Sequence, residues 1–170
     1  MMENKIEITV ASSITENDWK RLTTWREYVF SPEGKGTDWI GGKMHIIASS
    51  SDAAIGHIGF DVYRLIIDGQ ETECIGVGAV VVIPEFQGMS LPARMFACLR
   101  DLRDEKHPGL PLALFCPKSL VSYYHRHRFD ECFKEVWYTQ KGEFVLSKFS
   151  FMMDGAIDVK SRIEIPTNPW

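Results

Sequence analysis

The 170-residue sequence lacks several features that would assign a protein to a class at once. No apolar run approaches the roughly 20 residues that span a bilayer, and residues 1–10 contain no signal-peptide core. None of the four cysteines forms a Cys-x-x-Cys pair, so neither a zinc ribbon nor a thioredoxin-like site is indicated. Positive charge is not in excess, since 19 Lys and Arg stand against 23 Asp and Glu. We therefore expect a cytoplasmic protein that binds no metal, no membrane and no nucleic acid.

The remaining composition is that of an ordinary folded domain. Hydrophobic residues make up 45% of the chain and charged residues 25%, which is typical of a globular protein rather than a disordered one. The sequence contains no internal repeat, low-complexity tract or linker. Because one domain typically holds ~100–200 residues, residues 1–170 are expected to form a single domain.

Hydrophobic periodicity predicts the elements of this domain. Alternating or wholly apolar segments predict strands over residues 5–10, 44–48, 54–67, 72–83, 112–116, 131–138 and 143–151. Helical spacing predicts helices over residues 16–29, 91–106 and 119–127. Thr15 with Asp18 resembles a capping box, and Asp68-Gly69 is a hairpin signal. The order of these elements indicates an α+β layer architecture.

The strand over residues 72–83 ends in an apolar run that is typical of a central strand covered on both faces. Gly76 and Gly78 within it indicate a bulge, or a close approach of a ligand or another backbone segment. Residues 84–88 then turn the chain directly into the helix over 91–106. Such a turn aims unpaired amides and the positive end of a helix dipole at one spot, which suits a pyrophosphate.

Three segments, in this order, resemble the GCN5-related N-acetyltransferase (GNAT) superfamily. The strand that ends at Ile83 leads into residues 87–92 (QGMSLP), which are similar to the acetyl-CoA loop Gln/Arg-x-x-Gly-x-Gly/Ala. The short strand over 112–116 follows, and residues 123–129 (YYHRHRF) are similar to the motif Phe-Tyr-x-x-x-Gly-Phe. The resemblance implies a GNAT-like acyl-CoA N-acyltransferase fold, with a mixed, mostly antiparallel sheet of about seven strands and helices on both faces.

The same resemblance implies acetyl-CoA as co-substrate. In the family the pantetheine arm lies where two strands splay apart, so Val80, Val81 and Val82 would pair with its amides and polarise the thioester. The residues that match the pyrophosphate-binding loop are Gln87, Gly88, Met89, Ser90, Leu91 and Ala93. Ser90 and Pro92 stand where the pattern has glycine or alanine. Ser90 can cap the helix, whereas Pro92 has no N–H to offer.

Acetyl transfer to an amine needs a base for the ammonium proton and an acid for the departing thiolate. By resemblance Tyr124 is the acid, while its neighbour Tyr123 is expected to belong to the core. Many members carry a glutamate on the strand before the loop, but Gly78 stands at that position. Glu73, further upstream on the same strand, is the expected substitute, acting directly or through water. The alternatives on the neighbouring strand are His57 and Asp61.

The acceptor is predicted from a looser likeness. The long strands of the meander, the hairpin and the final tryptophan look somewhat like the aminoglycoside 2′-N-acetyltransferases, which implies a cationic acceptor. Carboxylates would hold its charge and aromatic rings would stack on its apolar faces. The acceptor-binding residues expected in the loop after the first helix are Glu33, Asp38 and Trp39. Further candidates near the C-terminus are Asp154, Asp158 and Trp170.

The sequence thus predicts transfer of an acetyl group from acetyl-CoA to a primary amine of a small, cationic acceptor. Two alternatives stay open: a catalytically silent module that binds or senses acyl-CoA, and a transferase that uses another acyl donor. Because dimers are common in the superfamily, a homodimer is open as well.

Overall fold

The computed structural model describes residues 5–25, 36–155 and 157–170. The strands within these residues are β1 (Ile6–Ala11), β2 (Met44–Ser50), β3 (Ala53–Ile67), β4 (Gln70–Val82), β5 (Leu112–Cys116), β6 (Asp130–Cys132), β7 (Glu135–Gln140), β8 (Glu143–Leu146), β9 (Ser150–Asp154) and β10 (Arg162–Ile165). The helices are α1 (Glu16–Thr23), α2 (Leu91–Lys106) and α3 (Val121–Arg126), with short 3-10 turns η3 (Pro84–Phe86) and η4 (Lys118–Leu120).

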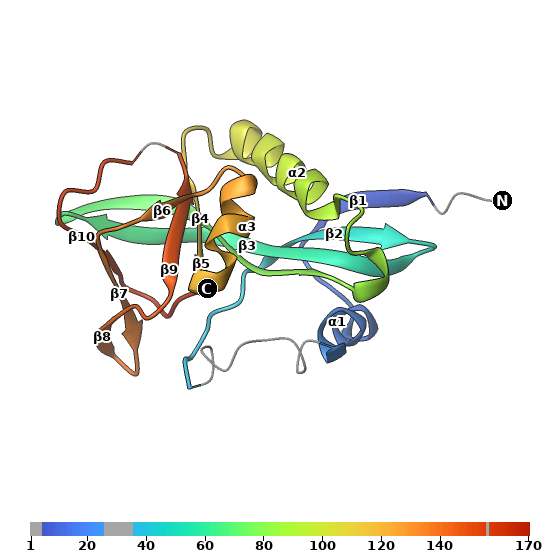
Figure 1. Ribbon diagram of the computed structural model, residues 1–170, viewed down its shortest axis with the longest axis horizontal. Helices are drawn as coiled ribbons and strands as arrows, with labels where there is room; N and C mark the ends of the chain where they lie inside the picture. Colours follow the sequence, from blue (N-terminus) through green and yellow to red (C-terminus); the bar gives the residue numbers. More distant parts are fainter. Residues whose placement is uncertain (1–4, 26–35, 156) are drawn as a thin grey trace.

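All of these strands belong to one mixed sheet. Its order is β6-β9-β5-β4-β3-β10-β7-β8, and β2 and β1 extend it from the first part of β3. Most neighbours are antiparallel, whereas β4–β5 and β10–β7 are parallel. Figure 1 shows the hairpin of β3 and β4 running through the length of the molecule. The predicted mixed, mostly antiparallel sheet is confirmed.

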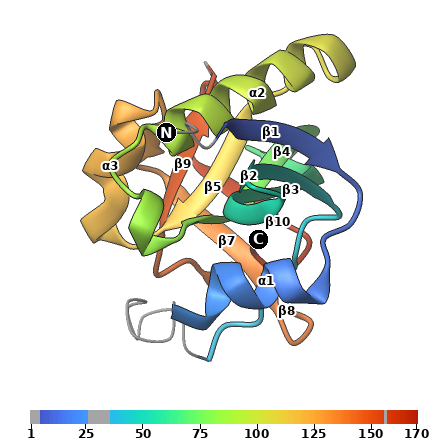
Figure 2. The ribbon, with the colours of Figure 1, turned by 90° about the vertical axis from the view of Figure 1, so that its right-hand side faces the viewer.

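Helices cover both faces of the sheet, as predicted. α1 and α2 lie on opposite sides of β2, β3 and β4 in both ribbon views (Figures 1 and 2). The short α3 packs beside β6 and β9. Among the described residues, none of the helices is long and apolar enough to cross a membrane.

The beginning of α1 follows the predicted capping pattern. The hydroxyl of Thr15 accepts the N–H of Asp18 at 3.1 Å and donates to the Asp18 carboxylate at 3.0 Å. The same carboxylate accepts the N–H of Ala54 at 3.1 Å, which ties the helix to β3. α1 ends at Thr23, and its expected extension over residues 26–29 lies outside the described residues.

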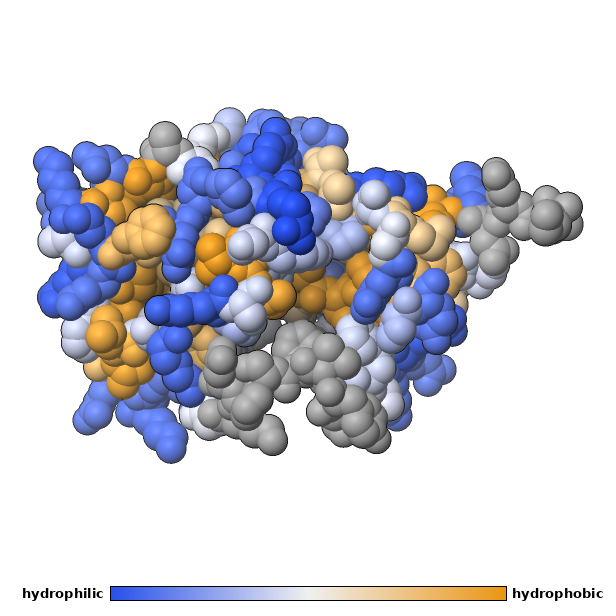
Figure 3. Space-filling model, viewed as in Figure 1, coloured by the Kyte–Doolittle hydropathy of each residue, from blue (hydrophilic) through white to orange (hydrophobic). Residues whose placement is uncertain are grey.

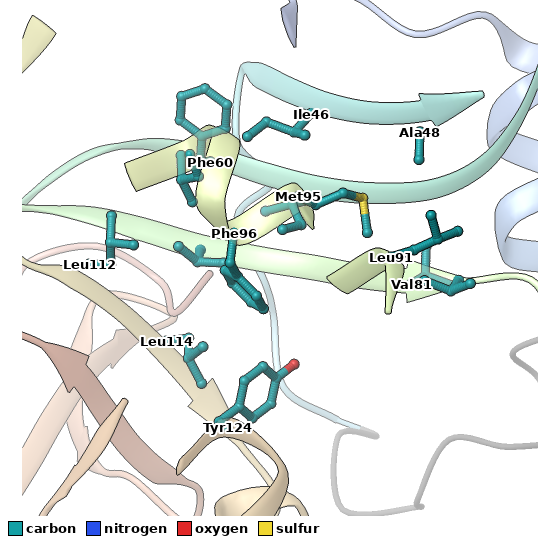
Figure 4. Close-up of a cluster of buried hydrophobic side chains, with 14 of the residues drawn as sticks. Ile46, Ala48, Phe60, Val81, Leu91, Met95, Phe96, Leu112, Leu114 and Tyr124 are labelled. Carbon is teal, nitrogen blue, oxygen red and sulfur yellow. The ribbon is translucent and has the colours of Figure 1, made fainter. Parts of the chain in front are cut away.

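Two clusters of buried side chains share the β3–β4 hairpin. The first lies between α2 and β2–β4 (Figure 4) and includes Ile46, Phe60, Val81, Met95 and Phe96. The second lies at the other end of the sheet, among β3, β7, β9 and β10. It is rich in rings, and its largest members are Tyr63, Tyr138, Phe149, Phe151 and Trp170. Because both clusters hold the same hairpin, the middle of β4 is supported from two directions.

The C-terminal strands differ from the prediction in number and place. The expected strand over 131–138 is two strands, β6 and β7, and the expected strand over 143–151 is β8 and β9. Ser147 turns the chain between the latter two: its hydroxyl donates to the carbonyl of Phe149 at 3.0 Å and accepts its N–H at 3.1 Å. β10 was not predicted. The described residues therefore form ten strands instead of about seven.

Apolar side chains are exposed at the edge strand β8. Phe144 and Leu146 are 49% and 52% exposed, and Figure 3 shows apolar residues gathered over this strand at the lower left. The expected homodimer stays a prediction.

Candidate functional site

The parallel strands β4 and β5 separate in the middle of the sheet. They pair only at Ile75 with Leu112 and at Gly76 with Ala113. Beyond these pairs, β4 continues to Val82 and β5 continues through the next three residues without further pairing between the two described strands. Backbone groups that β4 directs towards β5 in this region need another partner. This is the part of β4 at which the sequence predicts the pantetheine arm.

A β-bulge interrupts β4 where the separation begins. The register between β3 and β4 shifts between His57 and Gly59, so Ala79 and Val80 together lie opposite one residue of β3. Ala79 has a φ of 47°, in the left-handed region that residues with a Cβ rarely adopt. The carbonyl oxygen of Ala79 accepts a hydrogen bond from Nδ1 of His57 at 2.8 Å. The bulge predicted from the two strand glycines is therefore present, one residue beyond Gly78.

The two strand glycines also make room for aromatic rings and main chain. A Cβ on Gly76 would lie 2.3 Å from the ring of Tyr63 and 2.5 Å from the ring of Trp170. These two rings are stacked, with centroids 4.4 Å apart and planes 6° apart. A Cβ on Gly78 would lie 3.1 Å from the main-chain carbonyl carbon of Trp170. The site is therefore crowded at position 78, where the resemblance would place a glutamate.

Trp170 does not offer its ring to solvent, contrary to its candidacy as an acceptor-binding residue. It is 5% exposed, and its indole N–H donates to the carbonyl of Ala113 at 3.0 Å. Asp154 is likewise engaged, because its carboxylate pairs with the largely buried guanidinium of Arg100. At these contacts both residues stabilise the fold.

The turn from β4 into α2 presents the residues predicted to bind the pyrophosphate. Leu91 is buried and anchors the helix. The exposed members are Gln87, Gly88, Met89, Ser90 and Ala93. The Gln87 side chain donates to the carbonyl of Val82 at 3.0 Å, which holds the turn against the end of β4.

Ser90 does not cap α2 as predicted. Its φ is 57° and its ψ is 24°, whereas a capping side chain normally belongs to a residue with extended backbone. Within the described residues, the Ser90 hydroxyl accepts none of the N–H groups of the first helical turn. The amides of Leu91 and Ala93 have no intrahelical partner at this position. Leu91 is fully buried, whereas Ala93 is exposed, so the Ala93 amide is the one that an anionic ligand can reach.

Tyr124 projects from α3 beside Leu114 of β5, and its hydroxyl points away from the helix (Figure 4). It is 8% exposed, and its ring packs edge-on against Phe96 with centroids 6.4 Å apart. The neighbouring Tyr123 ring is nearly perpendicular to it, at 83°, and burial raises the pKa of the Tyr123 phenol. The two adjacent phenols therefore occupy different environments.

The structure does not bring Glu73 to the bulge. Glu73 is exposed and lies six residues before Ala79, which is about 20 Å along an extended strand. Asp61 is opposite Gly76 in the β3–β4 pairing. Since opposite residues of an antiparallel pair point to the same face, the Asp61 carboxylate shares the face of Gly76 and lies diagonal to Gly78. An acidic group thus stands beside the position at which the strand glutamate is missing.

Of the predicted acceptor-binding residues, Trp39 lies near the separated strands. Its ring is 5.0 Å from the ring of Phe149 and 6.4 Å from that of Phe115 on β5, and it is 42% exposed. The neighbouring Asp38 is exposed, while its N–H and carbonyl both bond to the side chain of Gln140. The third candidate, Glu33, lies outside the described residues.

A groove of about 480 Å³ lies between the end of α1 and the turn after β4. Its lining residues are Arg21, Thr24, Trp25, Ile83, Pro84, Glu85 and Phe86. Within the described part of the chain, the buried indole N–H of Trp25 has no hydrogen-bond partner. The groove therefore combines an apolar wall with a donor group and one charge of each sign.

The described residues contain no group of three or more His, Cys, Asp or Glu side chains arranged to hold a metal. All four cysteines are free thiols. Burial raises the pKa of Cys116, beside the separated strands, to about 12.

Comparison with known proteins identifies the fold. No protein-family model matches the sequence, and none of the curated proteins does. Several solved structures, however, are similar to this chain. ElaA of Escherichia coli is similar with a TM-score of 0.57 and 16% identity, over 88% of this chain and 99% of that chain. A GNAT family acetyltransferase of Brucella melitensis in complex with acetyl-CoA has a TM-score of 0.54 and 18% identity, over 92% and 94%. The GNAT family N-acetyltransferase YhbS of E. coli in complex with CoA has a TM-score of 0.58 and 13% identity, over 98% and 93%. The chain has the GNAT fold.

Within the GNAT fold, the separation of β4 from β5 and the turn into α2 lie where the sequence predicts the acyl donor. The roles of the single residues and the likeness to aminoglycoside acetyltransferases stay predictions. Sequence reasoning missed the contact of Trp170 with Gly76 and Gly78, although the two glycines indicated that something approaches the strand closely. It also gave little weight to His57, which contacts the bulge.

Proposed function

We propose that this protein transfers an acetyl group from acetyl-CoA to a primary amine of a small acceptor. The observation that supports this most is the separation of β4 from β5 directly beside a bulge in β4. An unpaired strand edge offers amide groups to an extended ligand with its own amides, as pantetheine has. Val80, Val81 and Val82 supply this edge in the proposal.

The phosphate end of the donor is assigned to the beginning of α2. The first-turn amide of the exposed Ala93, together with the positive φ of Gly88 and Ser90, favours an anion there. Pro92 offers no N–H, so this chain has one phosphate contact fewer than the motif would provide. We therefore propose binding of the pyrophosphate through exposed main-chain groups at residues 87–93.

The chemical step forms one bond and breaks one. The amine nitrogen attacks the thioester carbonyl carbon, the C–S bond breaks, and the thiolate takes a proton. We assign this proton to the Tyr124 phenol, and the tyrosinate left behind regains a proton when the attacking nitrogen loses its second N–H proton to become a neutral amide. The ammonium proton of the acceptor must leave first, and we assign it to Asp61, directly or through a water molecule, instead of Glu73. Asp61 is favoured because it faces the same side as Gly76, whereas Glu73 is exposed about six residues before the bulge.

The acceptor is proposed to be a cationic amine with an apolar face. The half-exposed ring of Trp39 offers a stacking surface next to Phe149, and the exposed Asp38 adds negative charge. Glu33 is a further candidate for the same charge, as the sequence predicts.

A silent acyl-CoA-binding module is the second candidate. It is favoured by the absence of a side chain at Gly78 and by Pro92 in the loop. In this case the donor would bind between β4 and β5 without turnover.

Release of the CoA thiol from acetyl-CoA, measured against a panel of primary amines, tests the proposal. We expect turnover with at least one cationic amine, a loss of about 10²-fold or more in kcat for Tyr124→Phe, and a change of less than about threefold for the matched control Tyr123→Phe. Binding of acetyl-CoA without turnover on any amine would establish the silent module. A protein that binds no acyl-CoA would contradict both candidates, and competition with other acyl-CoA donors in the same assay would reveal a different donor.

A further inference from the structure

A buried histidine contacts the backbone at the bulge of β4. His57, on β3, is 1% exposed and is one of only four polar or charged residues that are buried among the described ones. Its Nδ1 lies 2.8 Å from the carbonyl oxygen of Ala79, and its Nε2 lies 2.9 Å from Nδ1 of His45 on β2. The edge of the Trp19 ring on α1 packs against it, with centroids 5.3 Å apart. The imidazole is therefore fixed on three sides.

These contacts determine where the protons are. A carbonyl oxygen only accepts hydrogen bonds, so Nδ1 of His57 must carry its proton. In the neutral ring Nε2 is then an acceptor, and Nδ1 of His45 must donate to it. Burial lowers the pKa of His45, which favours the neutral form of His45. His45 therefore selects the tautomer in which His57 donates to Ala79.

The bulge needs such a donor. Ala79 has a left-handed φ of 47° without being glycine, a conformation that is strained for a residue with a Cβ. The extra residue of a bulge also leaves the β ladder, so its carbonyl must find a partner outside the ladder. The hydrogen bond from His57 supplies this partner at the position where the strain is located.

We propose that His57, oriented by His45, is a positioning residue that holds the Ala79 bulge and thereby aims the amides of Val80 and Val81 at the donor thioester. The part of this inference that concerns the thioester rests on the proposed function, whereas the hold on Ala79 does not. His57 touches the main chain of Ala79 and acts on the reaction only through it. Its contribution is to the geometry of the main chain.

A metal site or a purely structural role accounts for the histidine pair less well. A metal site would need a third ligand, and the described residues provide no such group. A buried histidine with a purely structural role needs only a hydrogen-bond partner for each ring nitrogen. Such a role does not explain why His57 donates its hydrogen bond to Ala79, the one left-handed residue within the interior of β4.

A set of variants separates positioning from mere burial. The side-chain amide of asparagine reaches the place of Nδ1, whereas that of glutamine reaches the place of Nε2. His57→Asn can therefore still donate to Ala79, while His57→Gln and His57→Leu cannot. The Asn and Gln variants are both polar and differ by one methylene, so they form a matched pair if the Leu variant does not fold.

The first measurement is independent of activity. Nitrogen-15 NMR of the wild-type imidazoles should show a protonated Nδ1 on His57. The carbon chemical shifts of Ala79 should report positive φ in the wild type and in His57→Asn, and strand-like φ in His57→Gln and His57→Leu. A His57 protonated only on Nε2, or left-handed Ala79 shifts in every variant, would overturn the proposal.

The second measurement concerns the reaction. For the Gln variant we expect kcat with acetyl-CoA to fall about 10- to 100-fold, while the Kd of CoA, which has no thioester carbonyl, changes less than about threefold. His57→Asn should keep kcat within about fivefold of the wild type. Equal kcat values in the Asn and Gln variants would contradict the use of the bulge in catalysis. A wild type without turnover would refute the proposed function, while the Ala79 shifts would still decide the hold on the bulge.

Discussion

The two sides of β4 are built from different parts of the sequence. On the proposed donor side, towards the end of β5 and the beginning of α2, the residues that would bind the donor lie close together in the sequence, from residue 79 to residue 93. On the proposed acceptor side, Tyr63 of the neighbouring strand and Trp170, far along the sequence, press on β4 at Gly76. The proposed donor side therefore depends on one continuous segment of the chain, whereas the proposed acceptor side depends on contacts between segments that are distant in the sequence.

The largest effect is expected from breaking the acceptor side at its tightest contact. Gly76→Ala would place a Cβ 2.3 Å from the ring of Tyr63 and 2.5 Å from that of Trp170. Neither stacked ring can retreat within a packed cluster, so the free energy of unfolding should fall by about 3 kcal/mol. Chemical denaturation measures this change.

The matched control is Gly41→Ala, because nothing lies within 4 Å of a Cβ at Gly41. Its free energy of unfolding should stay within about 0.5 kcal/mol of the wild type. Equal stability of the two variants would show that the rings do not press on β4.

A second prediction concerns Asp61, the carboxylate proposed as the base. Asp61→Asn should lower kcat about 100-fold, because the amide takes no proton from the ammonium group. Glu73→Gln, on the same hairpin, should leave kcat within about twofold. Steady-state kinetics with the best acceptor of the panel compares them, and the reverse order of effects would restore Glu73 as the base.

These two predictions show where sequence reasoning reaches its limit. The order β-α-β-β-β-α-β, the Thr15 cap and the turn after β4 depend on neighbouring residues, so periodicity and turn chemistry predicted them. The split of residues 143–151 into β8 and β9 depends on the pairing of β9 with β5, and no glycine or proline in this segment indicates a break. The same holds for the site. Gly76 and Gly78 signalled a close approach, but the identity of the approaching residue, Trp170, which lies 94 and 92 residues later in the sequence, is a property of the fold.

A smaller effect is expected in acid, at the clamp between the β3–β4 turn and the beginning of β10. The Asp68 carboxylate accepts a hydrogen bond from the Ser161 hydroxyl and others from the N–H groups of Lys160, Ser161 and Arg162. These bonds hold the pKa of Asp68 well below its usual range, the Ser161 hydroxyl first among them.

Because the folded state binds this proton less readily than the unfolded state, the contribution of Asp68 to stability is complete above the ordinary carboxyl pKa near 4. It is lost as the pH falls from there towards the lower pKa of the folded state. Asp68→Asn should therefore be less stable than the wild type at pH 7, and the difference should shrink as the pH is lowered below 4. Thermal unfolding between pH 7 and pH 2 measures it, with the exposed Asp158→Asn as control. A difference that does not depend on pH would contradict this role of the Asp68 carboxylate.

The smallest expected effect is a change in stability at Ser90, in the turn before α2. Ser90 stands in a left-handed conformation that glycine adopts without strain, and its hydroxyl makes no cap to lose. Ser90→Gly should raise the free energy of unfolding by about 0.5 kcal/mol. The matched control Ser122→Gly, within α3, should lower it by about 0.5–1 kcal/mol. A loss of stability in both variants would indicate that the Ser90 hydroxyl contributes to the turn.

The proposed function depends on where the acyl donor binds, and amide NMR tests that position most directly. Titration of the protein with CoA should shift the backbone amides of residues 80–82, 88–91 and 93 together, with one Kd. Those of Glu73 and of the groove at Trp25 should remain unchanged. Shifts confined to the groove, or an absence of shifts at Val80 and Val81, would contradict the assignment of the donor to the opening between β4 and β5.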